Sequence, residues 1–276
     1  MLGQDVVSAT TAAAHEPVGL THAQLDICDA EAVREAVRAA RADVVVNCAA
    51  WTDVDGAEAQ PGEAEAVNGD GAANVARAAF EAGAWTIHVS SDYVFEGSKL
   101  EPYVESDPPA PASEYGRSKL AGEIAVAREA PEHHSIVRSS WLFGSGGPCF
   151  PATILRVGAE REFLQVVDDQ EGCPTFTGHL GPALVDLCNR RPVGILHAAG
   201  GGSCSWFEFA SEIVRAAGLS CEVKPGRTAD LGRPAPRPAY SVLGTERPAD
   251  VPALPEWRTG LAEYLSARAV PGVGAR

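Results

Sequence analysis

Short apolar runs alternate with longer helical patterns along the first half of the chain. The runs Asp43–Cys48, Ala84–Ser90 and Ser135–Arg138 fit buried parallel strands, as does the shorter run Pro17–Leu20. An alternation of strands and helices predicts an α/β fold with a doubly wound parallel sheet and right-handed crossovers. Ligands of such sheets bind at the carboxyl ends of the strands.

Three helices are predicted between these strands, over residues 30–40, about 57–82 and about 114–129. Asp29 and Ser113 directly precede the first and third helices, and both are residue types that cap helix N-termini. Gly83 follows the second helix and suits a C-cap.

The second half of the chain differs in character. Strand-like runs are fewer, and Pro and Gly cluster at 144–151, 200–202 and 225–238. We therefore expect a smaller, mainly substrate-binding lobe over 142–276, following a first domain over 1–141, and we leave open a return of the second part to the sheet. The Gly- and Pro-rich tail over 269–276 is expected to fray.

Charge and composition exclude several classes of function. The net charge is −15, from 22 Lys and Arg against 37 Asp and Glu, which disfavours general binding of nucleic acid or anionic membranes. No run of about 18 apolar residues is present, and the first five residues form neither a basic segment nor an apolar run, so we predict no membrane span and no signal peptide. Seven scattered cysteines without a C-x-x-C pair favour reduced thiols in a cytoplasmic protein.

Tyr115 and Lys119 form the most informative pair in the sequence. Residues four apart on a helix share one face, and an ammonium near a phenol lowers the phenol's pKa, so that Tyr can exchange a proton near neutral pH. Y-x-x-x-K alone is a weak pattern, because a solvated Lys one turn from a packed Tyr is common. Ser90 and Ser91 strengthen it, since they end a predicted strand where a hydroxyl can polarise a substrate carbonyl. The alternative for these serines is a turn with helix-capping hydroxyls.

The order of motifs resembles the extended short-chain dehydrogenase/reductases and, among them, the dTDP-4-dehydrorhamnose reductase family. Each matching segment is weak, but they follow one another in the family's order over nearly the whole chain. The segments are Leu2–Gln4, Leu25–Ile27, Val46–Asp55 with Glu58, Val67–Asn68, Ser90–Phe95, Tyr115–Glu123, Arg138–Phe143, Asp169–Gln170 with Gly172, Pro174 and Thr175, and Arg237–Pro238 with Ser241.

This resemblance implies a Rossmann-type dinucleotide-binding domain and reduction of the C4 ketone of a dTDP-4-dehydro-6-deoxyhexose to dTDP-L-rhamnose. It implies that Tyr115 donates the proton, that Lys119 tunes Tyr115 and contacts the nicotinamide ribose, and that Ser91 hydrogen-bonds the carbonyl. The family usually has Thr at the position of Ser91, so the hydroxyl is kept and a methyl is lost.

The resemblance also implies two sets of binding residues. The cofactor set comprises Leu2, Gly3, Gln4, Asp26, Ile27, Ala49 and Ala50, together with Tyr115 and Lys119. The sugar-nucleotide set comprises Thr52, Val54, Asp92, Tyr93, Trp141 and Arg237. We expect Trp141 to offer a flat apolar wall, with core packing as the alternative, and Arg237 to meet a substrate phosphate, with a surface cation as the alternative.

The sequence gives only a weak indication of whether NADH or NADPH is the cofactor. An acid at the end of the second strand would hold the ribose of NAD, but the residues after Leu20 contain none. This favours NADPH over NADH, with His22 either beside the cofactor phosphate or on the surface. Some relatives place acids and Mg²⁺ at a dimer contact. These acids have no residue-by-residue match here, so we assign no metal ligands and leave a role for Mg²⁺ open.

One departure from the family concerns the first residues. Members begin with a strand and a G-x-x-G-x-x-G turn that cradles the pyrophosphate, whereas Met1–Gly3 matches only the end of that turn. We expect about a dozen upstream residues, a strand and its turn, in the natural protein. The alternative is a truly short chain with defective cofactor binding.

We expect the protein to be a monomer or a homodimer. Two alternative functions remain open. One is a 4-ketoreductase or epimerase acting on another nucleotide deoxysugar, since pocket shape decides the substrate. The other is a non-catalytic binding subunit, because the regulatory subunit of methionine adenosyltransferase resembles the same family.

Overall fold

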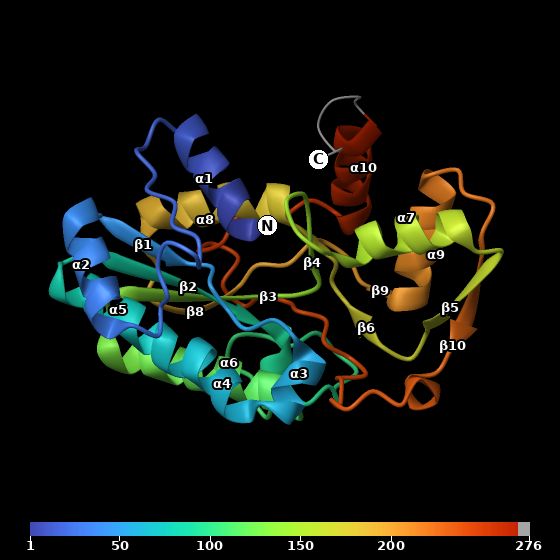
Figure 1. Ribbon diagram of the computed structural model, residues 1–276, viewed down its shortest axis with the longest axis horizontal. Coiled ribbons are helices and arrows are strands. Elements are labelled where there is room, and N and C mark those ends of the chain that lie inside the picture. The colour runs from blue at the N-terminus through green and yellow to red at the C-terminus, as the bar shows by residue number, and fades with distance from the viewer. Residues whose placement is uncertain (270–276) are drawn as a thin grey trace.

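The computed structural model describes residues 1–269 of the chain, which form two lobes side by side (Figure 1). The first lobe is built on a parallel four-stranded sheet in the order β1-β2-β3-β8. Its strands are β1 (Val44–Asn47), β2 (Trp85–Ser91), β3 (His134–Ser139) and β8 (Gly194–His197). Every residue of β2 and β3 is buried, as expected for strands covered by helices on both faces.

Helices cover both faces of this sheet (Figure 1). One face carries α1 (Leu2–Ala12) and α8 (Thr177–Arg190), and the other carries α2 (Ala30–Ala40), α5 (Ala72–Glu81) and α6 (Glu114–Glu129). On the face covered by α1 and α8, Leu2 and Val6 pack with the leucines of α8 against β2 and β3. The observed architecture is the doubly wound α/β sheet that the strand and helix alternation predicts.

The capping residues begin their helices as predicted. The Asp29 side chain accepts hydrogen bonds from the amides of Glu31 and Ala32, and the Ser113 hydroxyl accepts one from Gly116. Gly83 follows α5 with a φ of +74°, a backbone conformation that suits glycine.

The single helix predicted over 57–82 is wrong, because this segment is broken. It comprises α3 (Val54–Ala59), α4 (Pro61–Glu65), the π-helical turn η1 (Ala66–Gly71) and α5. Pro61 has no amide hydrogen to continue α3, and it takes the first position of α4, where none is needed.

The predicted strand over Pro17–Leu20 is also wrong. The segment is irregular, with Val18 64% and Leu20 49% exposed. A strand is held by hydrogen bonds to a neighbour, and within residues 1–269 β1 pairs only with β2. An apolar run of four residues without such a neighbour has no partner for its backbone groups.

The second lobe consists of short strand pairs and three helices. The pairs are β4 (Leu142–Phe143) with β7 (Thr175–Phe176), β5 (Phe163–Val167) with β10 (Glu222–Gly226), and β6 (Glu171–Gly172) with β9 (Cys204–Ser205). The helices are α7 (Phe150–Glu160), α9 (Trp206–Ala216) and α10 (Trp257–Ala269). Phe143, Phe209 and Trp257 lie at the centre of this lobe's core.

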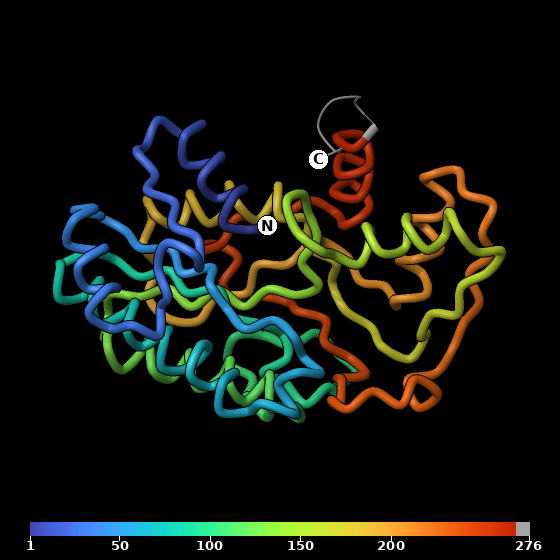
Figure 2. Tube along the Cα trace, in the orientation of Figure 1, coloured from blue at the N-terminus to red at the C-terminus, as the bar shows by residue number. Residues whose placement is uncertain are grey.

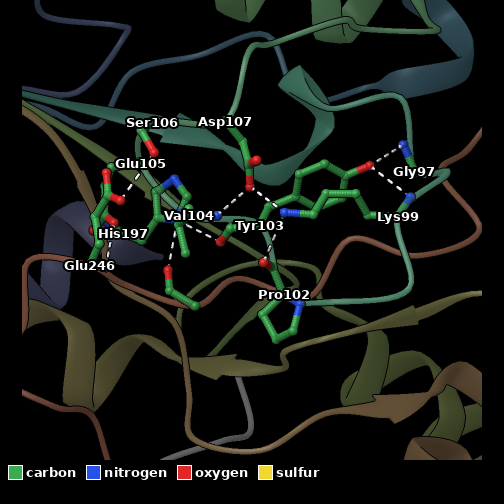
Figure 3. Close-up of polar contacts among 11 residues, drawn as sticks. Gly97, Lys99, Pro102, Tyr103, Val104, Glu105, Ser106, Asp107, His197 and Glu246 are labelled. Atoms are coloured by element: carbon green, nitrogen blue, oxygen red, sulfur yellow. Dashed lines mark hydrogen bonds and ion pairs between the residues drawn. The ribbon is translucent and has the colours of Figure 1, made fainter.

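The chain crosses between the lobes more than once. α8 and β8 belong to the second half of the sequence but complete the first lobe, and the segment after the 3₁₀ turn η3 (Thr228–Leu231) runs back toward the sheet (Figure 2). Glu105 holds this returning segment. Its carboxylate accepts hydrogen bonds from the His197 amide, the Thr245 hydroxyl and the Glu246 amide, at 3.0, 2.6 and 2.9 Å. Figure 3 shows Glu105 beside His197 and Glu246.

Within residues 1–269, no helix combines the length and the apolar character that a membrane span needs. The tail predicted to fray lies, from residue 270, outside the described residues.

Candidate active site

The carboxyl ends of the central strands bring the candidate residues together. Ser91 ends β2 and lies in register with Ser139, which ends β3. Asn47 ends β1 and is held to His88 of β2 by a side-chain hydrogen bond of 3.3 Å. This edge faces the second lobe, because β3 continues directly into β4 (Figure 1). It is the edge at which doubly wound sheets bind ligands.

α6 presents Tyr115, Lys119 and Glu123 along one face, at successive intervals of four residues. Lys119 is only 2% exposed, and its ammonium donates a hydrogen bond to the carbonyl of Val89 at 2.8 Å. Burial lowers the pKa of Lys119 to about 8, while the negative charge of Glu123 opposes this shift.

Tyr115 differs from the sequence-based expectation. Burial raises the pKa of its phenol to about 12, and the nearby Ser91 hydroxyl opposes the shift. The Lys119 ammonium is bonded to the backbone of β2. The pKa of Tyr115 is raised rather than lowered, and the tuning of Tyr115 by Lys119 stays a prediction. A protonated phenol at neutral pH is nevertheless the form that a proton donor requires.

Asp92 and Tyr93 follow Ser91 in the 3₁₀ turn η2 (Asp92–Val94). Asp92 is 2% exposed, and the Ser91 hydroxyl donates a hydrogen bond to its Oδ1 at 3.0 Å. Burial raises the pKa of Asp92 to about 7, and the nearby hydroxyls of Ser241 and Ser91 oppose the shift. The ring of Tyr93 meets that of Tyr115 edge to face, with centroids 5.5 Å apart.

A buried ion pair fixes α6 to the two central strands. The Arg138 guanidinium of β3 donates two hydrogen bonds to the Glu123 carboxylate, at 2.8 and 2.6 Å, and the Ser90 hydroxyl of β2 donates a third at 2.6 Å. Arg138 is 1% exposed and Glu123 is 3% exposed. This pair, called the Glu123–Arg138 clamp below, sets the position of Tyr115 and Lys119 relative to Ser91.

The start of α1 lies beside the end of β1. A Cβ on Gly3 would contact the Cβ of Cys48 at 3.8 Å. Burial raises the pKa of Cys48 to about 12, and the positive charge of Lys119 opposes this rise. No side chain caps this helix. A helix N-terminus beside the strand ends is suited to the phosphates of a dinucleotide, so the residues present fit such a cofactor.

Two glycines of the loop after β4 lie against the first residues of the chain. A Cβ on Gly146 would overlap the side chain of Gln4, and one on Gly147 would lie 3.3 Å from that of Met1. Leu2 differs from its neighbours, because its side chain packs into the core between the sheet and α8. Leu2 is one of the predicted cofactor residues, and only its backbone is therefore available to a ligand.

The other predicted cofactor residues lie in loops on the β1 side. Asp26 accepts a hydrogen bond from the Cys28 amide at 2.9 Å, which lowers the pKa of its carboxyl. Ile27 packs against the core cluster around Val33. Ala49 is exposed and Ala50 partly exposed directly after β1.

Trp141 follows β3 with a φ of +46° and stacks on Trp206, the first residue of α9, with centroids 3.5 Å apart. A Cβ on Gly172 would lie 2.5 Å from the indole of Trp141. One face of the predicted apolar wall is thus covered by Trp206, while the ring is held tightly at the junction of the two lobes.

Arg237 is engaged by a protein carboxylate. Its guanidinium donates to both carboxylate oxygens of Asp55 on α3, at 3.0 and 2.8 Å, and to the carbonyl of Ala235. This bidentate pair ties the returning segment to α3, next to the exposed Thr52 and the half-buried Val54. In this structure Arg237 is therefore neither a free surface cation nor free for a phosphate.

Several partners were not assigned a role from the sequence. Ser241 faces Asp92, Asp55 holds Arg237, and Asn68 joins the loop after β1 to α6 through Trp51 and Ser118. These contacts join distant positions, for which a single sequence carries no signal. The pattern Ser205-x-x-Glu208 did mark the start of α9, where the capping box is present. Within residues 1–269, no group of three or more His, Cys, Asp or Glu side chains is arranged to hold a metal ion.

Residues 1–270 match the family described as RmlD substrate binding domain. Among curated proteins, the chain is 42% identical to a dTDP-4-dehydrorhamnose reductase of Streptomyces griseus, over 99% of this chain and 94% of the relative. It is 37% identical to a dTDP-4-keto-6-deoxy-D-glucose reductase of Streptomyces niveus, over 95% of this chain and 92% of the relative.

Among solved structures, the fold is similar to a dTDP-4-dehydrorhamnose reductase of Bacillus anthracis in complex with NADP. The TM-score is 0.93 at 36% identity, covering 96% of this chain and 95% of the other. The likeness therefore extends over both lobes and the edge between them.

Proposed function

The chain belongs to the RmlD substrate binding domain family, and from this premise we propose that it reduces the C4 ketone of dTDP-4-dehydro-L-rhamnose to give dTDP-L-rhamnose, with NADPH as reductant. One observation carries the proposal. Ser91 ends β2 and Tyr115 lies on α6, yet contacts on either side of Ser91 bring them to the same ligand-binding edge of the sheet. The ring of Tyr93, two residues after Ser91, meets that of Tyr115 with centroids 5.5 Å apart, and the Lys119 ammonium, one helical turn from Tyr115, donates to the carbonyl of Val89 at 2.8 Å.

NADPH, when bound, supplies the hydride for such a reduction. In this proposal the N-terminus of α1 and Gly3 hold its phosphates, while Ala49 and Ala50 line the dinucleotide along the end of β1. The NADP in the Bacillus anthracis structure supports this choice over NADH.

The chain's own residues then handle the oxygen of the ketone. The Ser91 hydroxyl donates a hydrogen bond to the carbonyl oxygen, and Tyr115 transfers its phenolic proton to the alkoxide that develops there. The raised pKa of Tyr115 keeps that proton in place until negative charge appears next to it. Lys119 is buried beside them and adds positive charge to the site while it is protonated.

We assign the sugar nucleotide to the junction of the two lobes. Asp92 and Tyr93 lie on the sheet side of this junction and Trp141 lies where β3 enters the second lobe. Arg237 acts by holding α3, and with it Thr52 and Val54, through Asp55. The protein is proposed to act in the cytoplasm as a monomer or homodimer without a required metal ion.

A second candidate is a 4-ketoreductase for another dTDP-deoxysugar. The relative from Streptomyces niveus favours it, because its name gives a D-glucose-derived substrate at an identity close to that of the rhamnose enzymes.

The test is consumption of NADPH with a panel of dTDP-4-keto-6-deoxy sugars. The proposal expects the highest kcat/KM with dTDP-4-dehydro-L-rhamnose, unchanged by a chelator. A preference for dTDP-4-keto-6-deoxy-D-glucose would select the second candidate. A folded protein that oxidises NADPH with no member of the panel would favour a non-catalytic binding subunit.

A further inference from the structure

Glu58 lies on the short helix α3 and reaches across to α6. Its carboxylate accepts a hydrogen bond from the amide of Glu114, the first residue of α6, at 2.8 Å. The first amides of a helix have no carbonyl partner within that helix, and an acceptor that carries negative charge is favoured there. Tyr115 is the next residue along the chain. Glu58 therefore holds the backbone directly before the proposed proton donor.

The first turn of α6 lies tightly against the turn that follows β2. A Cβ on Gly116 would overlap the carbonyl oxygen of Tyr93, so the backbone of α6 rests directly on that of η2. The Ser113 hydroxyl caps the same turn by accepting from the Gly116 amide at 3.1 Å. The rings of Tyr93 and Tyr115 meet edge to face at this contact. A shift of the first turn would therefore move Tyr115 relative to the end of β2.

α3 is fixed at the same time to the returning segment. Asp55 lies three residues before Glu58, on the same side of the helix. Its carboxylate accepts from the Arg237 guanidinium at 3.0 and 2.8 Å and from the Ala235 amide at 3.2 Å. Figure 1 shows α3 next to both α6 and the returning segment. A single turn of helix thus joins Arg237 to the start of α6.

We propose that Glu58 is a positioning residue for Tyr115. Its hydrogen bond to the Glu114 amide keeps the first turn of α6, and with it the Tyr115 phenol, in place, while Asp55 keeps α3 on the returning segment. Glu58 contacts neither the ketone nor the cofactor in this role. Proton transfer depends on how the phenol is placed against the ketone oxygen, and a displacement of about 1 Å can reduce the rate about 100-fold. The role rests on the proposed reductase function.

The test compares variants of the full chain with NADPH and dTDP-4-dehydro-L-rhamnose. Glu58→Ala removes the acceptor, so kcat should fall about 10- to 100-fold. KM for NADPH should stay within about twofold of wild type, because the start of α1 is untouched. Glu58→Gln keeps a side-chain oxygen that can accept from the same amide, so its kcat should stay within about threefold of wild type.

Asp29→Ala is the matched control. Asp29 also accepts hydrogen bonds from the first amides of a helix, those of Glu31 and Ala32, but on α2, which carries none of the proposed reacting residues. Both alanine variants should lower Tm, because each removes a carboxylate that pairs with a helix N-terminus. Only Glu58→Ala should lower kcat. A purely structural role for Glu58 would instead give the two variants the same kcat.

A second readout does not depend on turnover. Hydrogen exchange followed by mass spectrometry reports how often the amides of residues 114–118 open to water. In Glu58→Ala these amides should exchange about fivefold faster than in wild type, since the turn has lost one of its hydrogen bonds. In Asp29→Ala they should exchange at the wild-type rate.

Two failures are distinguishable. If Glu58→Ala keeps the kcat of wild type, if Glu58→Gln loses as much kcat as Glu58→Ala, or if exchange over residues 114–118 is unchanged, the positioning role is overturned and the reductase remains. If wild type reduces no 4-keto sugar, the proposed function falls, and the positioning role with it.

Discussion

The Glu123–Arg138 clamp gives the sharpest prediction about stability. Both partners are almost fully buried, and the guanidinium also lies over the Phe95 ring at 5.0 Å. Within the described residues, Nη1 of Arg138 has no hydrogen-bond partner. The intact pair therefore bears a desolvation cost and adds little net stability, whereas breaking it leaves a lone buried charge.

Glu123→Leu and Arg138→Met each remove one partner at similar volume. Each single variant should lower the free energy of unfolding by about 3–5 kcal/mol, because the remaining charge is uncompensated. At about 2 °C per kcal/mol for a chain of this size, Tm should fall by about 6–10 °C. The double variant replaces the pair with apolar groups, so its free energy of unfolding should return to within about 2 kcal/mol of wild type.

Urea and thermal unfolding followed by circular dichroism measure this cycle. Arg34→Met provides the control, since its pair with Glu31 is exposed and should be worth about 0–1 kcal/mol. The reasoning is refuted if each single variant costs no more than this surface pair, or if the losses of the two single variants simply add in the double variant.

Three further predictions concern the site. Tyr115→Phe should lower kcat about 10²- to 10⁴-fold with little change in KM or Tm, and a kcat within about threefold of wild type would remove Tyr115 as proton donor. Gly172→Ala places a Cβ 2.5 Å from the Trp141 indole. It should lower the free energy of unfolding by about 1–3 kcal/mol and raise KM for the sugar nucleotide. Gly62→Ala, where the added Cβ meets open space, should change neither quantity. Burial lowers the pKa of Lys119 to about 8, below the 10.5 of the unfolded chain. Wild type should therefore gain stability relative to Lys119→Met as the pH rises from about 8 to about 10.5. The same pH dependence of unfolding in both proteins would contradict a buried ammonium.

Local rules predict much of the first lobe. β-branched runs became β1, β2 and β3, and Asp29 and Ser113 cap the helices that they precede. Pro17–Leu20 shows the limit of such rules, because a strand depends on a neighbour that the run itself does not specify.

The reactive residues were predictable because their spacing carries their geometry. Tyr115 and Lys119 share a helix face, and Ser91 sits at a strand end. Their environment was not predictable, since it is made by contacts such as Asp92 with Ser241 and Arg237 with Asp55, which lie far apart in the sequence. Burial in that environment raises the pKa of Tyr115.

The most direct test of the account is transfer of deuterium. NADPH carrying deuterium at the transferable position of its nicotinamide is mixed with dTDP-4-dehydro-L-rhamnose, and the product is examined by mass spectrometry and NMR. The account predicts one deuterium on C4 of the sugar, formed by wild type and at a much lower rate by Tyr115→Phe. NADPH left unoxidised, or a product without deuterium at C4, would contradict it.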